Sequence, residues 1–156
     1  MLNNKGFSLI ELLVVVLILG ILAAMAIPQY MRVIERQRGM EAITILAIIG
    51  KAQERFFVTN GEVYATVFQD IDADFIDFST GQPPTGATFN HRLFTFTISG
   101  STCATGKATA ARKTGAYTIQ RCFTNGALCC TGTDTDLCDN LGLNSCEANI
   151  CQDTSC

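Results

Sequence analysis

The feature that most constrains this chain is a long apolar run near its N-terminus, from Phe7 to Ile27, which carries one acidic residue, Glu11. At ~1.5 Å per residue, a helix over this run is about 31 Å long, which matches the hydrocarbon core of a bilayer. Its Leu, Ile, Val and Phe side chains favour insertion by roughly 4–8 kcal/mol, against about 3 kcal/mol for one carboxylate. The run predicts a membrane-spanning helix with a functional Glu11, because another Leu would serve better in a simple anchor.

A cleaved secretory signal peptide is an alternative interpretation of the same run. A signal peptide has a basic segment, an apolar stretch of about 7–15 residues and a cleavage site of small residues. Here the run is longer, Lys5 is the only basic residue before it, and residues 23–26 lead into Ile27 and Pro28 without a polar exit. A retained helix is therefore favoured over a signal peptide, and both over a buried core helix.

The helical pattern continues after the apolar run and becomes amphipathic. Gly20 lowers helix propensity and Pro28 lacks a backbone donor, so we expect both to bend or loosen the helix. Apolar residues then recur at three- and four-residue spacing, with charged residues on the other side. The apolar positions are Ala42, Ile45, Leu46, Ile49, Ala52 and Phe56. Asn60 and Gly61 predict the end of the helix.

The remaining chain predicts a small β-sheet. Residues 62–87 form an irregular connection, broken most strongly at residues 83–86 (PPTG). Residues 89–98 alternate in polarity and predict one strand, and residues 116–123 repeat the pattern more weakly. An antiparallel sheet packed on the second half of the helix would bury both apolar faces. The predicted fold class is therefore α+β.

The C-terminal part of the chain holds all eight cysteines. They are Cys103, Cys122, Cys129, Cys130, Cys138, Cys146, Cys151 and Cys156. Their even number, in a segment with few large apolar residues, predicts disulfides formed in an oxidising compartment, although the sequence does not determine their pairing. Metal binding is the alternative, but there is no Cys-x-x-Cys and the only histidine is His91. We predict no metal and no cofactor.

An acidic cluster offers a weaker candidate for calcium binding. Its residues are Asp134, Asp136, Asp139 and Asn140. Cys138 stands where an EF-hand loop would carry an acid, and Ser145 replaces the final Glu. A polar, disulfide-rich loop is the better interpretation.

A basic stretch without acids could touch DNA or another acidic surface. It consists of Lys107, Arg112, Lys113 and Arg121. A solvated face is the favoured interpretation, and the net charge of −3 does not suggest a nucleic-acid binder. No nucleophile, base and orienting group can be assembled around His91, so we predict that the chain is not an enzyme.

Three segments of the N-terminal region carry a family resemblance. They resemble the class III signal and N-terminal helix of bacterial type IV pilins and pseudopilins. The segments are residues 5–13 (KGFSLIELL), 20–24 (GILAA) and 26–30 (AIPQY). A weaker similarity through residues 38–42 and 53–57 is closer to pilus pilins, PilE-like minor ones included, than to secretion pseudopilins. Beyond about residue 66 no family pattern is visible.

The resemblance implies roles for individual residues. Prepilin peptidase would cut between Gly6 and Phe7 on the cytoplasmic side, and Phe7 would be N-methylated. Glu11 would pair with the amine of Phe7 on a neighbouring subunit, since opposite charges attract strongly in a medium of low dielectric. Its alternative role is to snorkel to the headgroups. The chain would divide into a leader (1–6), a transmembrane or filament-core helix (7–30) and a head (31–156) with a Cys-rich region (103–156).

Orientation in the membrane follows from the resemblance rather than from charge. Arg32, Arg36 and Arg38 follow the apolar run, partly offset by Glu35 and Glu41, so the positive-inside count is equivocal or even inverted. The resemblance places the leader in the cytoplasm and the rest outside.

The function that the resemblance implies is that of a structural subunit of a type IV pilus, supporting adhesion, twitching motility or DNA uptake. Its partners would be other pilins, prepilin peptidase and the inner-membrane assembly machinery. The precursor would cross the inner membrane once, and the mature subunit would lie in a pilus at the cell surface. The alternatives are a type II secretion pseudopilin and a minor pilin whose head binds DNA or a surface.

Overall fold

One long helix, α1 (Leu9–Thr59), opens the structure, a computed structural model that describes residues 8–133, 135–147 and 150–151. The chain divides into two units, Met1–Glu35 and Arg36–Cys156. The helix ends where the sequence predicts: the amide N–H of Asn60 donates to the carbonyl of Phe56 at 2.9 Å, and Gly61 follows with a φ of 73°. Glycine suits this position because a side chain disfavours positive φ.

The second unit contains a six-stranded sheet whose strands follow one another in chain order. The strands are β1 (Thr88–Asn90), β2 (Phe94–Ser99), β3 (Lys107–Arg112), β4 (Tyr117–Cys122), β5 (Leu128–Gly132) and β6 (Asn144–Ser145). Neighbouring strands are antiparallel except β5 and β6, which are parallel. A 3₁₀ turn, η1 (Phe68–Asp70), precedes the sheet, and a short helix, α2 (Thr135–Asn140), joins β5 to β6.

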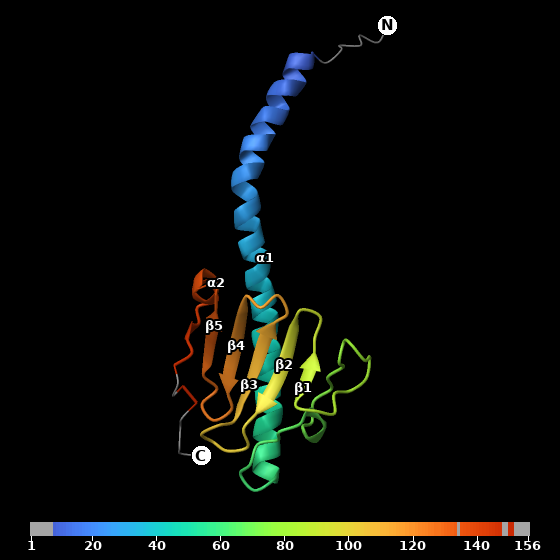
Figure 1. Ribbon diagram of the computed structural model, residues 1–156, viewed down its shortest axis with the longest axis vertical. Coiled ribbons are helices and arrows are strands. Elements are labelled where there is room, and N and C mark those ends of the chain that lie inside the picture. The colour runs from blue at the N-terminus through green and yellow to red at the C-terminus, as the bar shows by residue number, and fades with distance from the viewer. Residues whose placement is uncertain (1–7, 134, 148–149, 152–156) are drawn as a thin grey trace. The chain divides into compact units, whose positions relative to one another are not determined.

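The core of this unit lies between the sheet and the second half of α1, which runs behind the strands in Figure 1. Alternate residues of β2, β3 and β4 are buried, as a sheet with one solvated face requires. The helix buries four of the six predicted apolar positions, and Ile45 and Phe56 are partly buried. The predicted α+β fold, a long helix on an antiparallel sheet, is confirmed.

The prediction of a single strand over residues 89–98 is wrong. The segment folds into two antiparallel strands, β1 and β2, with Phe89 opposite Phe96. The turn between them is closed by the amide N–H of His91, which donates to the carbonyl of Phe94 at 2.9 Å. The alternation inside β2 was correctly predicted, but the polar His91-Arg92 step breaks it.

Three further strands, β3, β5 and β6, were not predicted from the sequence. The β3 sequence, KATAAR, is rich in Ala, which has low strand propensity. Ala108 and Ala110 are nevertheless fully buried, because β3 lies between β2 and β4. Its place in the sheet comes from pairing on both edges rather than from its own sequence.

A buried glutamine fastens the chain after α1 back onto the helix. The side chain of Gln53 is fully buried, and its amide Nε2 donates to the carbonyl of Ala65 at 2.9 Å. The N–H of Ala65 in turn donates to Gln53 Oε1 at 2.9 Å. Both backbone groups of one residue are therefore satisfied without a strand partner.

Three disulfides whose two cysteines are both described stabilise the C-terminal region, as the sequence predicts. They join Cys122 to Cys151, Cys129 to Cys146, and Cys130 to Cys138. Cys103 is also disulfide-bonded, whereas Cys156 lies outside the described residues. None of the described cysteines is free. The bridges join β4 and β5 to the polar segment that follows, where few large apolar side chains are available.

We predict that all eight cysteines are oxidised in the exported protein, and that a chain beginning at Met31 is a soluble, disulfide-bonded head. The helix has lost its membrane half in this chain but keeps the half that covers the sheet. On reduction, the intact mass should rise by one hydrogen per cysteine. Several free thiols in the native head would contradict the prediction.

Candidate functional site: the apolar helix and its acidic residue

The first unit offers one long, uncovered apolar surface on α1. Every residue from Leu9 to Val33 is exposed, and Leu9 itself is 91% accessible. The mean hydropathy of the most apolar window is 2.9, and none of it is buried by the rest of the chain. Large apolar surfaces are rarely left in water, so this helix needs lipid or other protein around it. By length and composition it can cross a membrane.

Glu11 lies in the first turn of α1 and caps it. Ser8 immediately precedes the helix, and its backbone N–H donates to Glu11 Oε2 at 3.2 Å. Serine before a helix with glutamate three residues later is the pattern of a capping box, in which the acid satisfies a free backbone donor. The negative charge also suits the positive end of the helix dipole. This local role was missed, although the Ser-x-x-Glu spacing is visible in the sequence.

The other predicted residues of this region are placed as follows. Gly6 and Phe7, the predicted cleavage and methylation site, lie outside the described residues. Gly20 and Pro28 lie within α1, which runs through both without interruption. Proline removes one hydrogen bond from a helix interior, so the bend at these positions stays a prediction.

The predicted basic stretch is not one surface. Arg112 is buried, its Nη1 donates to the carbonyl of Leu93 at 3.0 Å, and its guanidinium lies 5.5 Å from the ring centre of Phe94. Arg121 points toward α1, where a Cβ added to Gly50 would lie 2.5 Å from its Nε. Lys107 lies on the outer face and Lys113 in a turn. The favoured interpretation of a solvated face is wrong for Arg112, because neighbouring strand positions alternate between faces.

The predicted acidic cluster gains no support as a cation site. Asp134 lies outside the described residues, and the structure does not describe the side chain of Asp136. Among the described residues, no group of His, Cys, Asp and Glu is placed to hold a metal ion. His91 has its Nε2 3.7 Å from an oxygen of Glu41, which is a contact between a turn and the helix.

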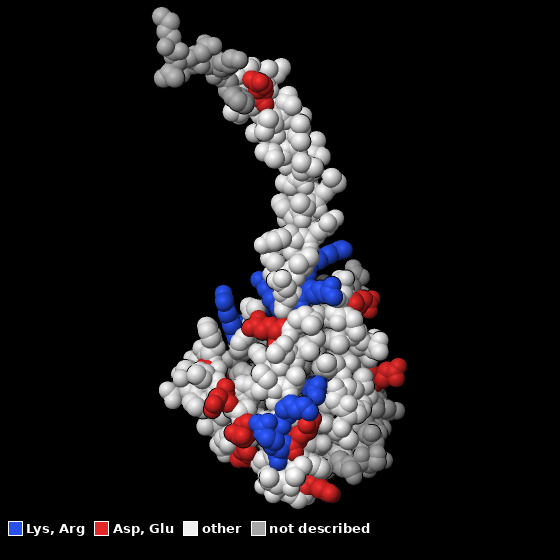
Figure 2. Space-filling model, turned by 180° about the vertical axis from the view of Figure 1, so that it is seen from behind, with Lys and Arg blue, Asp and Glu red and all other residues white. Residues whose placement is uncertain are grey.

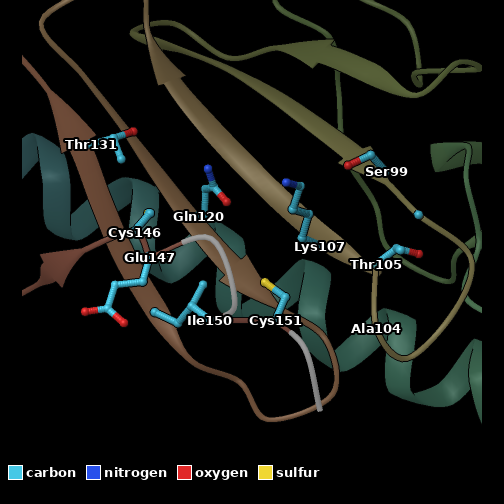
Figure 3. Close-up of a pocket in the computed structure, with 11 residues that line it drawn as sticks. Ser99, Ala104, Thr105, Lys107, Gln120, Thr131, Cys146, Glu147, Ile150 and Cys151 are labelled. Atoms are coloured by element: carbon cyan, nitrogen blue, oxygen red, sulfur yellow. The ribbon is translucent and has the colours of Figure 1, made fainter. Parts of the chain in front are cut away.

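A polar groove lies on the outer face of the sheet (Figure 3). It has a volume of about 510 Å³. Lys107, Gln120 and Thr131 line it from three neighbouring strands, and Glu147 and Ile150 line it from the C-terminal segment. Among its described lining residues, no hydrogen bond joins a hydroxyl to Lys107 or Glu147 as a nucleophile would be joined to its base, so we assign no reaction to it.

Asp77 is the ionisable residue that the sequence analysis missed. Its side chain is 7% exposed and accepts hydrogen bonds from the hydroxyl of Ser79 and from the backbone N–H groups of Asn90 and Ser79, both at 2.8 Å. The side-chain hydrogen bond from Ser79, followed by the backbone hydrogen bond from Asn90, lowers the pKa of Asp77 well below its usual value. The carboxylate thereby fastens the irregular connection to β1.

Comparison with known proteins identifies the N-terminal segment. Residues 1–27 match the family model described as the prokaryotic N-terminal methylation motif. This chain has the motif and the fold of a type IV pilin. The prediction of this family is confirmed, and the pilin resemblance agrees with the long exposed helix and the disulfide-bonded head described above.

Three relatives illustrate the similarity to pilins. The type IV major pilin protein PilA of Myxococcus xanthus is 50% identical over 55 residues, which are 35% of this chain and 25% of PilA. A fimbrial protein of Moraxella nonliquefaciens is 41% identical over 79 residues, 51% of this chain and 50% of the relative. The type IV major fimbrial protein FimA of Dichelobacter nodosus is 65% identical over 35 residues, 22% of each chain.

The chain spans half or less of the length of these relatives. Their names are those of pilins and fimbrial proteins, which are structural proteins, and this agrees with the prediction that the chain is not an enzyme.

We predict that Asp77→Asn lowers the free energy of unfolding at neutral pH, and that the difference from wild type narrows as the pH falls below about 4. Because the pKa of Asp77 is lower in the folded state, its carboxylate contributes its full stabilisation of the fold at pH values above the unfolded pKa of about 3.9. This contribution is lost as the pH falls toward the folded pKa. Urea unfolding of the head at about pH 7 and about pH 2.5 tests this. Asp74→Asn, which changes an exposed carboxylate, is the control. An equal difference at both pH values would contradict the prediction.

Proposed function

We propose that this pilin is a structural subunit of a type IV pilus, held in the membrane and then in the filament by the first part of α1. The observation that carries the proposal is the uncovered apolar helix with Glu11 in its first turn, in a segment that matches the N-terminal methylation motif. In the membrane, lipid covers this helix. In a filament, the helices of other subunits replace the lipid.

Processing is the first step of the proposed function. Prepilin peptidase cuts between Gly6 and Phe7 on the cytoplasmic side, and the new N-terminus at Phe7 is methylated. Gly6 has no side chain, so the backbone can approach a protease closely. The proposal is supported by the methylation motif over residues 1–27.

Replacing Gly6 by a bulky residue is expected to leave the leader attached while the chain still enters the membrane. The reason is that the change alters the cleavage site but not the apolar run that drives insertion. N-terminal sequencing and intact mass of the membrane fraction measure this. A wild-type N-terminus located after Ala24 or Ala26 would instead indicate an ordinary signal peptide.

Glu11 has two proposed roles that the same carboxylate can fill in turn. In the single chain it accepts the N–H of Ser8. In the filament it neutralises the amine of Phe7 on a neighbouring subunit. Each charge would be costly to bury alone, by about 3–5 kcal/mol when one partner of a buried pair is removed. The pairing therefore favours assembly over insertion of isolated subunits.

Glu11→Leu is expected to leave membrane insertion intact and to reduce filament yield at least about tenfold, which corresponds to the loss of about 1.4 kcal/mol or more per contact. Sheared filaments are compared with the membrane pool at matched expression. Glu11→Gln is the decisive control, because glutamine also completes a capping box but carries no charge. Glu11→Gln should fail like Glu11→Leu.

Normal assembly of Glu11→Gln, together with failure of Glu11→Leu, would assign Glu11 to capping alone. Normal assembly of both variants would refute the pairing role and would show that the cap is not needed for assembly.

The proposed location is the inner membrane for the precursor and the cell-surface pilus for the mature subunit. The proposed partners are other pilins, prepilin peptidase and the inner-membrane assembly machinery, and the pilus would serve adhesion, twitching motility or DNA uptake. Labelling of sheared surface filaments with antibodies against the head tests the location. Label confined to the periplasm would favour a type II secretion pseudopilin. Salt-dependent binding of DNA by the head would favour a DNA-binding minor pilin.

A further inference from the structure

Three exposed cations lie at the end of the second unit where the chain joins the apolar helix. We call Arg36, Arg92 and Lys113 the basic end; all three side chains are exposed. Arg36 is the first residue of the unit and lies on α1, five residues before Glu41. The other two lie in the turns that follow β1 and β3. No one stretch of the sequence contains them, so the fold is needed to bring them to one end.

Hydrogen bonds and one close side-chain contact fix these turns against each other and against the helix. Glu41 Oε1 lies 3.7 Å from His91 Nε2, which places the β1–β2 turn beside the start of the helix in this unit. The backbone N–H of Lys113 donates to the carbonyl of Leu93 at 3.1 Å, and Arg112 Nη1 donates to the same carbonyl at 3.0 Å. Arg112 thus orders both turns from inside, while Arg92 and Lys113 stay in solvent.

The charge at this end differs from that at the opposite end of the same unit. Figure 2 shows Lys and Arg side chains gathered where α1 enters the unit, and a larger share of Asp and Glu toward the other end. The described acids near the basic end include Glu35, directly before Arg36, as well as Glu41 and Asp139. Asp139 lies on α2, which follows β5 on the side of the sheet away from β1. At the other end, Asp70 and Asp72 lie near Arg55.

We infer that the basic end binds the phosphate headgroups of anionic phospholipids while the subunit is anchored in the bilayer. This inference rests on the proposed membrane-anchored precursor. The helix that enters the membrane is covalently attached at Glu35–Arg36, so this end of the unit is the one tethered to the lipid surface. In a cluster of Lys and Arg beside a membrane helix, each cation raises the affinity for anionic lipid about fivefold.

The same inference accounts for an otherwise unfavourable charge distribution. With the leader in the cytoplasm, arginines after the apolar run lie on the exported side, against the positive-inside tendency. Headgroup binding gives Arg36, one of these arginines, a favourable partner there. The acidic end of a second copy is the other partner of suitable charge, but it is present only during assembly, whereas headgroups are present throughout membrane residence.

The test compares phosphatidylglycerol with phosphatidylcholine on the full chain in mild detergent, with bound lipids counted by native mass spectrometry. The zwitterionic lipid controls for acyl chains that bind the apolar helix. The test variant is Arg92→Glu with Lys113→Glu, both in exposed turns. The matched control is Lys51→Glu with Lys107→Glu, which makes the same change in net charge away from the basic end: Lys107 begins β3, and Lys113 follows its end. Circular dichroism and oxidised mass verify that each variant is folded.

Wild type is expected to prefer phosphatidylglycerol, and the preference should fall with salt because exposed charges are screened. In the test variant, the preference for phosphatidylglycerol should fall about 25-fold or more, because each of the two cations contributes about fivefold. The control variant should keep most of the preference. No preference in wild type, or an equal loss in the control, would overturn the inference. A salt-sensitive dimer that is lost only in the test variant, without a lipid preference, would overturn it in favour of a second copy.

Alkaline extraction of cell membranes distinguishes this inference from the proposed function. A chain that stays in the membrane pellet but shows no lipid preference refutes headgroup binding alone. A chain that is released from the pellet refutes the anchored precursor itself.

Discussion

The structure depends on one constraint: the two halves of a single helix must each bury apolar surface, but in different surroundings. From Arg36 onward, one side of α1 is covered by the sheet, and residues such as Leu46 and Ile49 are completely buried. From Leu9 to Val33, every residue of the same helix is exposed. The sheet covers the apolar side of the second half of α1, whereas the apolar surface of the first half has to be covered by lipid or by another molecule. A change of partner, from lipid to protein, is therefore possible without any change in the fold of the head.

The head combines two kinds of stabilisation that act in different segments. Between α1 and the sheet, buried aromatic and aliphatic side chains form an ordinary core, with Phe89 stacked on Phe96 at 4.9 Å between ring centres. After β5 such side chains are scarce, and disulfides replace them, each typically contributing about 2–4 kcal/mol. The irregular connection before β1 uses a third means, the hydrogen bonds of Asp77 and Gln53.

Much of this arrangement could be predicted from the sequence because the relevant signals are local. The helix, its end at Asn60-Gly61 and the alternation of β2 follow from residue spacing. The strand β3 could not be predicted, because Ala108 and Ala110 are placed by pairing with both neighbours rather than by their own propensity. The role of Arg112 was missed for the same reason, since its burial depends on the turn at Leu93. The cap made by Glu11 is local, and the Ser-x-x-Glu spacing that produces it is visible in the sequence.

The order of the disulfides has a consequence for how the head tolerates a proteolytic cut. The bridge Cys130–Cys138 lies within the loop closed by Cys129–Cys146, which lies within the loop closed by Cys122–Cys151. A protease that cuts between Cys130 and Cys138 therefore leaves two pieces still joined by all three of these bridges. Loop closures nested in this way also need no threading of one segment through another. A cut between Cys130 and Cys138 thus does not release the polar C-terminal segment from the head.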